Sequence, residues 1–107
     1  MAAYFHLKPS GTQWMFNLVG GNHEVMLTSE RYASRQGAQG GIASVKVNAP
    51  DDARYARLTN SAGKPYFLLK AANGEPLGSS EAYSSVSARD QGIEAVKKAA
   101  PGASTKE

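Results

Sequence analysis

The 107-residue chain contains no cysteine, which excludes disulfide bonds, thiolate metal sites and cysteine nucleophiles. It has no apolar run approaching the ~18–20 residues that a membrane-spanning helix needs. The first residues also lack the basic segment and the long apolar segment of a secretory signal. From these absences we expect a cytoplasmic protein with no membrane partner.

Motifs of the common catalytic and cofactor-binding classes are also missing. The only histidines are His6 and His23, and neither has an Asp or Glu at a spacing typical of a catalytic triad or a metal site. The glycine-rich nucleotide loops, the zinc-protease motif and the calcium-loop motif do not occur. We therefore expect no enzymatic activity, no metal and no cofactor.

Charge of either sign is modest. The 12 Lys and Arg residues exceed the 9 Asp and Glu residues, for a formal net charge of +3. Proteins dedicated to nucleic-acid binding usually carry a denser basic stripe. The charge therefore permits an acidic partner without requiring one.

The most prominent feature that is present is an internal repeat. A shift of 51 positions aligns residues 4–50 with residues 55–101 without a gap. A repeat of this length is a supersecondary unit used twice, because one copy is too small to bury its own apolar face. Residues 51–54 are too few to separate two domains, so both copies belong to one domain. The aligned identities include Leu7 with Leu58, Phe16 with Phe67, and the element Ser-Glu-x-Tyr-x-Ser at 29–34 and 80–85.

Each copy begins with the period of two that is typical of strands and then changes to the period of a helix. Ser34 and Ser85 are expected to cap the two helices, which should end before Pro50 and Pro101. The strand patterns lie at 4–8, 14–19 and 24–28 in the first copy and at 54–58, 65–69 and 75–79 in the second.

The Ser-Glu-x-Tyr-x-Ser element precedes each expected helix and admits two interpretations. Backbone N–H groups at a helix N-terminus attract anions, so the hydroxyls of the element would form a ligand site. Alternatively, the last serine caps the helix, and Tyr32 and Tyr83 pack beneath their helices. We favour the architectural interpretation, because the glutamate of the element repels an anion. The recurring Gly41 and Gly92 likewise indicate close packing of each helix against the sheet.

Alternation along the strands separates a core face from an open face. The residues expected to face the helices include Phe5, Leu7, Trp14, Phe16, Leu18 and Met26. The candidate binding residues on the open face are Tyr4, His6, Tyr55, Arg57, Tyr66 and Lys70. Tyrosines interleaved with cations are how several single-stranded nucleic-acid binders stack bases and follow phosphates. Tyrosines also pair across any half-exposed sheet, and such a face can equally contact a protein partner or a second copy.

Three strings of residues resemble the YegP-like family of small bacterial proteins, and the resemblance covers nearly the whole chain. It implies a β-β-β-α unit, used twice, that builds one continuous antiparallel sheet with both helices on one side. Residues 20–23 and the helix glycines of the first copy depart from the family pattern. The family has no agreed activity or catalytic residues, so the resemblance implies none here. The strings are Ala-Ala-Asn-Gly-Glu (71–75), Ser-Ser-Glu-x-Tyr-Ser-Ser (79–85) and Gly-Ile-x-x-Val-Lys-Lys-x-x-Pro (92–101).

We therefore predict one α+β domain at 1–107, with repeats at 4–50 and 55–101 and a flexible tail at 102–107. Because the second copy supplies the second half of the fold internally, we expect a monomer. The function that we favour is that of a small binding or interaction module that uses the open sheet face. The alternative is single-stranded nucleic-acid binding through the same face.

Overall fold

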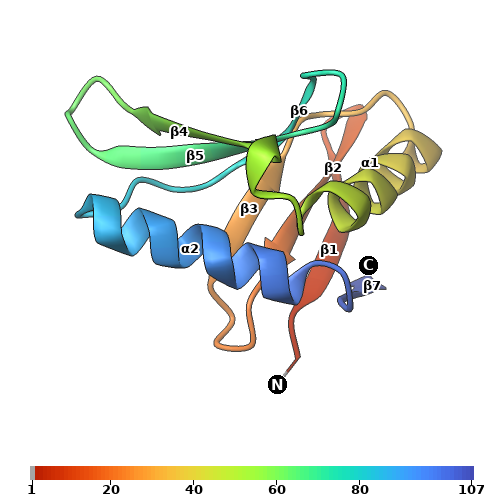
Figure 1. The fold of residues 1–107 in the computed structure, drawn as a ribbon. Coiled ribbons are helices and arrows are strands. Elements are labelled where there is room, and N and C mark those ends of the chain that lie inside the picture. Colours follow the sequence, from red (N-terminus) through yellow and green to blue (C-terminus); the bar gives the residue numbers. More distant parts are fainter. Residues whose placement is uncertain (1) are drawn as a thin grey trace.

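The computed structural model describes residues 2–107, in which one seven-stranded sheet carries both long helices on the same face (Figure 1). The strand order is β4-β5-β6-β3-β2-β1-β7. This arrangement confirms the α+β fold with two β-β-β-α repeats. The elements are β1 (Tyr4–Ser10), β2 (Gln13–Val19), β3 (Val25–Ser29), α1 (Arg35–Asn48), the 3-10 turn η1 (Asp52–Arg54), β4 (Tyr55–Thr59), β5 (Pro65–Lys70), β6 (Pro76–Ser79), α2 (Val86–Ala99) and β7 (Ser104–Lys106).

The repeats meet at the centre of the sheet, where β3 pairs with β6 in antiparallel orientation. Thr28 lies opposite Ser79, which is its own counterpart in the other repeat at a shift of 51. The pseudo-twofold axis between the repeats therefore passes between these two residues. The two repeats share one hydrophobic core, to which both helices and the strands of both repeats contribute.

The C-terminal residues correct two of our predictions. The sheet is mixed, because β7 pairs with β1 in parallel, Tyr4 opposite Ser104. Residues 104–106 are thus a strand and not part of a flexible tail. The edge of β1 offers unpaired backbone groups that β7 satisfies. Ala103 is buried just before this strand, and Glu107 forms an ion pair with Arg35 just after it.

Both helices begin and end where the sequence indicates. The Ser34 hydroxyl accepts a hydrogen bond from the Gly37 N–H at 2.9 Å, and Ser85 caps α2 in the same way. Each helix ends before its proline, which disfavours continued helical conformation in the preceding residue. In the described range, residues 2–107, no helix is long and apolar enough to cross a membrane.

The core lies between the sheet and the two helices. The rings of Phe5, Phe16 and Phe67 are fully buried in it. Trp14 is only half-buried, because it lies at the end of the sheet, where its backbone forms a bridge with Tyr32. The remaining core residues that are fully buried and large are Leu7, Leu18, Leu27, Leu69, Ile93, Val45 and Val96.

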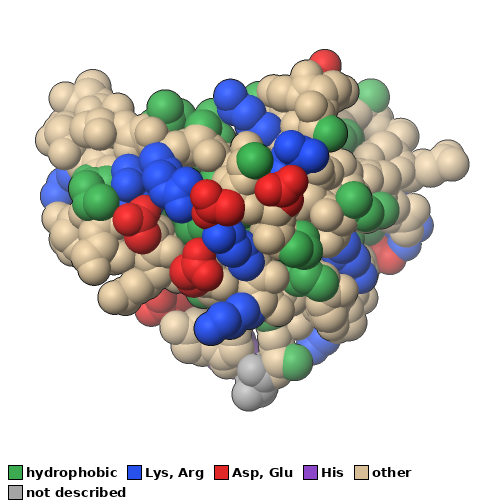
Figure 2. All heavy atoms as spheres, in the orientation of Figure 1, with side chains coloured by type: hydrophobic (Ala, Val, Ile, Leu, Met, Phe, Trp, Pro, Cys, Tyr) green, Lys and Arg blue, Asp and Glu red, His purple; other side chains and the backbone are tan. Residues whose placement is uncertain are grey.

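The charged residues are divided between the faces. None of the seven strands within the described residues contains an Asp or a Glu, so every acidic side chain lies in a loop, a turn or a helix. On the helix side, cations and carboxylates alternate over the surface (Figure 2). The sheet by itself is therefore a cationic layer.

The Ser-Glu-x-Tyr-x-Ser element has an architectural role in both repeats. The Ser29 hydroxyl accepts a hydrogen bond from the Phe16 N–H at 2.9 Å and donates one to the Glu30 carbonyl at 2.7 Å. Ser80 makes the same two bonds in the second repeat. Tyr32 stacks on Phe16 with ring centroids 6.2 Å apart. The serine hydroxyls considered for an anion site are thus used within each repeat, where they join the strands to the helix.

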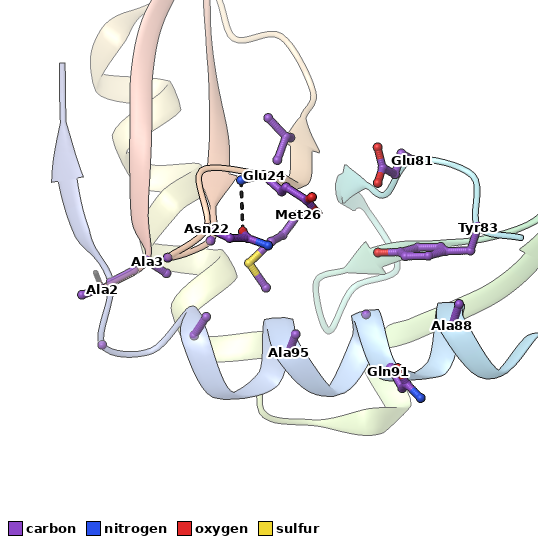
Figure 3. A pocket seen from close by; sticks show the side chains of 17 residues that line it. Ala2, Ala3, Asn22, Glu24, Met26, Glu81, Tyr83, Ala88, Gln91 and Ala95 are labelled. Atoms are coloured by element: carbon purple, nitrogen blue, oxygen red, sulfur yellow. Dashed lines mark hydrogen bonds between the residues drawn. The ribbon is translucent and has the colours of Figure 1, made fainter. Parts of the chain in front are cut away.

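The glycines of the two helices make room for these tyrosines. Tyr83 stacks on Phe67, and its hydroxyl end lies over α2 (Figure 3). A Cβ atom added at Gly92 would lie 2.7 Å from the Tyr83 Cζ, and one at Gly41 would lie 2.6 Å from the Tyr32 Cζ. Real Cβ contacts are longer, so the close packing expected of these glycines is against the tyrosine rings.

The repeats differ in register at their first strands, and the gapless alignment is wrong there. Leu7 lies opposite Phe16, but the residue opposite Phe67 is Arg57 and not Leu58. The first strands therefore correspond at a shift of 50. A one-residue slip moves every side chain of a strand to the other face.

The cause of the slip is a difference in hairpin loop length. The β1–β2 loop has two residues between the paired Ser10 and Gln13. In the β4–β5 hairpin, the Asn60 N–H bonds to the Lys64 carbonyl across three loop residues, the last of which is Gly63 at φ 80°. Three-residue loops of this kind use a left-handed residue, which glycine adopts readily.

Candidate functional site

Four of the six candidate residues lie on the open face of the sheet, opposite the helices. Tyr4 and His6 are on β1, and Tyr66 and Lys70 are on β5. All four are half-buried, since their strand neighbours cover the base of each side chain. These residues keep exposed surface with which to contact a partner.

The open face does not bring these four residues into one cluster. The strands β2, β3 and β6 lie between β1 and β5, so four inter-strand spacings, or about 19 Å, separate the two pairs. Asn17 and Thr28 occupy the middle of the face, where the Asn17 amide donates to the Thr28 hydroxyl at 3.0 Å. A ligand that contacts both pairs must be extended.

Lys106 joins the first pair, and the sequence analysis missed it. Its Nζ lies 4.6 Å from the centroid of the Tyr4 ring, a cation–π geometry. The residue was assigned to the flexible tail, so no face was expected for it. Ser104, Thr105 and Lys106 are all polar and show no apolar–polar alternation, so the sequence gives no strand signal in this segment.

The charged side chains that the described strands place on the open face are all cations. Strand alternation places Lys8 on the same face of β1 as Tyr4 and His6, and Lys8 lies opposite Met15 of β2. Lys8, Lys70 and Lys106 are thus cations on a face whose strands contribute no carboxylate within residues 2–107. This side favours a negatively charged ligand.

Tyr55 is not on the open face, which corrects its prediction as a binding residue. Its ring is buried on the helix side, edge-to-face with Phe67 at 5.7 Å between centroids. Its hydroxyl donates a hydrogen bond to the Ala49 carbonyl at 2.8 Å. Burial raises the pKa of Tyr55 well above its ordinary value, with further contributions from nearby carboxylates. The residue is part of the core.

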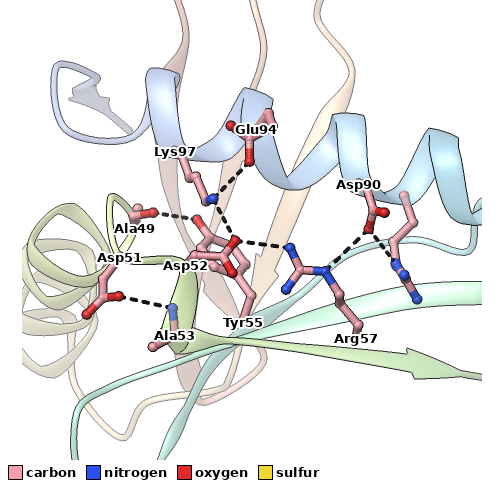
Figure 4. A network of polar contacts seen from close by, with 10 residues as sticks. Ala49, Asp51, Asp52, Ala53, Tyr55, Arg57, Asp90, Glu94 and Lys97 are labelled. Atoms are coloured by element: carbon pink, nitrogen blue, oxygen red, sulfur yellow. Dashed lines mark hydrogen bonds and ion pairs between the residues drawn. The ribbon is translucent and has the colours of Figure 1, made fainter.

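Arg57 is also on the helix side, because the one-residue slip of β4 turns both Tyr55 and Arg57 to that face. Its guanidinium lies 3.0 Å from Asp52 and 3.4 Å from Asp90, within the polar network of Figure 4. Lys97 contacts Asp52 at 2.6 Å. Hydrogen bonds from Arg57 and Lys97 lower the pKa of Asp52 to about 2. The cation predicted for ligand contact is instead paired with two carboxylates.

The described residues, 2–107, contain no group of three or more His, Cys, Asp or Glu side chains placed to hold a metal ion. The histidines lie apart, with His6 on β1 and His23 in the β2–β3 turn. His23 adopts φ 67° there, in the left-handed region. Its counterpart in the other repeat is Gly74, which has the same sign of φ. His23 therefore occupies a turn position and is not part of a side-chain cluster.

Comparisons with known proteins support the same fold. The family model "Domain of unknown function (DUF1508)" matches residues 10–55 and again residues 60–107. A UPF0339 protein of Bordetella pertussis is 63% identical over 107 residues, which cover 100% of this chain and 96% of that protein. The UPF0339 protein YegP of Escherichia coli K12 is 49% identical over 98 residues, covering 91% of this chain and 89% of YegP.

A solved structure shows the same architecture. The solution NMR structure of Escherichia coli YegP, titled as a protein of unknown function, has a TM-score of 0.91 at 46% identity and covers 99% of this chain and 92% of that one. The two family matches along the chain agree with the two structural repeats. The chain belongs to the DUF1508 family, a family of unknown function, and is similar over most of its length to the UPF0339 protein YegP.

Proposed function

We propose that this protein is a small binding module whose open sheet face contacts single-stranded nucleic acid. The observation that carries the proposal is the combination of tyrosine rings with cations of one sign on that face. Tyr4 and Tyr66 offer ring surfaces on which bases stack, and Lys8, Lys70 and Lys106 offer charges for phosphates.

The spacing between Tyr4 on β1 and Tyr66 on β5 suits an extended ligand. About 19 Å separates β1 from β5, and single-stranded binding sites on small β domains commonly span several nucleotides. The middle of the face carries the small or polar side chains of Asn17, Thr28 and Ser79, with which a strand that crosses the face can form hydrogen bonds.

Charge argues against self-association through this face. Two copies placed with their open faces together would bring lysines of like sign into proximity, which is unfavourable. A monomer that presents the face to an anionic partner avoids this cost.

The test is an amide NMR titration with a mixed-sequence single-stranded oligonucleotide at low and moderate salt. We expect shifts along the open face, from β7 and β1 across β2, β3 and β6 to β5, and none in α1 or α2. The shifts should fade as salt rises, because phosphate contacts release counterions. Tyr66→Ala and Lys70→Gln should weaken binding. Lys98→Gln, which removes the same charge from the helix side, serves as the matched control.

Two results would overturn the proposal. One is an unchanged spectrum at high oligonucleotide concentration. The other is equal weakening by Lys70→Gln and Lys98→Gln, which would indicate attraction to the net charge and no defined face.

A further inference from the structure

A groove of about 810 Å³ lies on the helix side, between α2 and the β2–β3 turn (Figure 3). From α2 it is lined by the small residues Ala88, Gly92, Ala95 and Ala99, and by Gln91. Met26 lines the opposite wall, and Gly102 and Ala103 also line the groove. The volume is within the range of small-molecule sites, which are mostly apolar with a few placed polar groups.

The charged residues that line the groove are both acidic. Glu24 comes from the β2–β3 turn and Glu81 from the segment before α2. Neither side chain takes part in any of the ion pairs formed among residues 2–107. The hydroxyl of Tyr83 points into the same space (Figure 3). Both carboxylates and this phenol thus line one groove.

The first repeat lacks this convergence, although it contains the same residue types. The counterparts of Glu81, Tyr83 and Glu24 at a shift of 51 are Glu30, Tyr32 and Glu75. None of these three counterparts lines the groove. Glu24, Glu81 and Tyr83 therefore share this groove, in a protein of net charge +3.

We propose that this groove binds a primary ammonium group carried on a linear aliphatic chain. An ammonium has three N–H donors, and Glu24, Glu81 and the Tyr83 hydroxyl offer three acceptors. The methylene chain then lies along the apolar wall formed by α2 and Met26. The groove is on the opposite side of the sheet from the open face, so this proposal is independent of nucleic-acid binding.

The test is a titration of the full chain with n-hexylammonium chloride, followed by amide NMR, with n-hexanol as an uncharged probe of equal length. We expect saturable shifts at Glu24, Tyr83, Gly92 and Ala95, and no such shifts with hexanol. Glu81→Gln and Glu24→Gln should each raise the Kd at least tenfold. Ala95→Leu, an exposed helix position that faces the groove, should also abolish binding.

Glu30→Gln and Glu75→Gln provide matched controls, because they remove the same charge from the corresponding positions of the other repeat. Both should bind hexylammonium as the wild type does. Equal weakening by these controls, comparable binding of hexanol, or binding that survives Ala95→Leu in a variant with a wild-type melt would each overturn the proposal.

Discussion

The two repeats share a set of packed aromatic rings, which we call the aromatic frame, but differ in the residues beside it. The frame consists of Phe5, Phe16 and Tyr32 in the first repeat and of Tyr55, Phe67 and Tyr83 in the second. In the first repeat, Leu7 on β1 and Ala38 on α1 are buried apolar residues. Their structural counterparts in the second repeat are Arg57 and Arg89, and both guanidinium groups contact Asp90. An apolar contact in one repeat is thus an ionic cluster in the other.

The difference shows which interactions the fold requires. Lys46 lies over Phe5 at 5.8 Å, and Lys97 lies over Tyr55 at 5.9 Å. Within residues 2–107, this contact between a helix lysine and a strand ring occurs in both repeats, whereas the ionic cluster occurs only in the second. Partly exposed ion pairs contribute little to stability, typically about 0–1 kcal/mol each. We infer that the buried rings and their helix contacts determine stability in both repeats.

The strongest test of an equivalent frame is a pair of core truncations. Phe16→Ala and Phe67→Ala each remove a fully buried ring at the same position of the two repeats. We expect each to reduce the free energy of unfolding by about 3–5 kcal/mol, measured by urea denaturation. A much smaller loss in one repeat would show that the frame is not shared.

The helix glycines sharpen the comparison. Gly41→Ala and Gly92→Ala each place a methyl group against a tyrosine, which we expect to cost about 1–3 kcal/mol. The loss should be larger at Gly41, because Phe16 Cε2 also lies 3.1 Å from the new atom and Tyr83 borders an open groove. Gly40→Ala is the control, since nothing lies near its added methyl group. It should stabilise, and a loss there would contradict the packing argument.

Tyr55→Phe makes the second repeat resemble the first, in which Phe5 holds this position. The variant loses the hydrogen bond to the Ala49 carbonyl, so we expect a loss of about 1 kcal/mol in the free energy of unfolding. The raised pKa of Tyr55 adds a prediction at high pH. Stability from the neutral phenol is present below about pH 10 and lost as pH rises above it, so the variant should be less sensitive to alkali. As a control, Tyr66→Phe on the open face should leave the free energy of unfolding unchanged.

The ionic cluster should be visible mainly as acid sensitivity. The pKa of Asp52 is about 2 in the folded protein, below the ~3.9 of an unfolded chain. Its contribution is therefore complete above about pH 4 and is lost as pH falls toward 2. We expect Asp52→Asn to reduce the fall in Tm between pH 5 and pH 2, with Glu75→Gln as the control. An identical pH profile for Asp52→Asn and the wild type would mean that the pairs with Arg57 and Lys97 do not persist in solution.

Much of the fold could be predicted from local sequence signals. The capping serines Ser34 and Ser85 and the following prolines bounded both helices correctly, because caps and prolines act within one or two turns. The open-face positions of Tyr4 and Tyr66 followed from the period of two within single strands. Tyr55 and Arg57 were misplaced, because the identity of Leu7 with Leu58 hid one extra loop residue.

The sequence by itself determined the repeat, the type of each long element and the core positions of Phe5, Phe16 and Phe67, since these depend on composition and short-range periodicity. Only the tertiary structure decided the register of β4, the addition of β7 at the sheet edge and the convergence of Glu24, Glu81 and Tyr83. Each of these depends on how segments distant in sequence meet. Hairpin length fixes which face a strand presents, and an edge strand forms only where a neighbouring edge is unpaired.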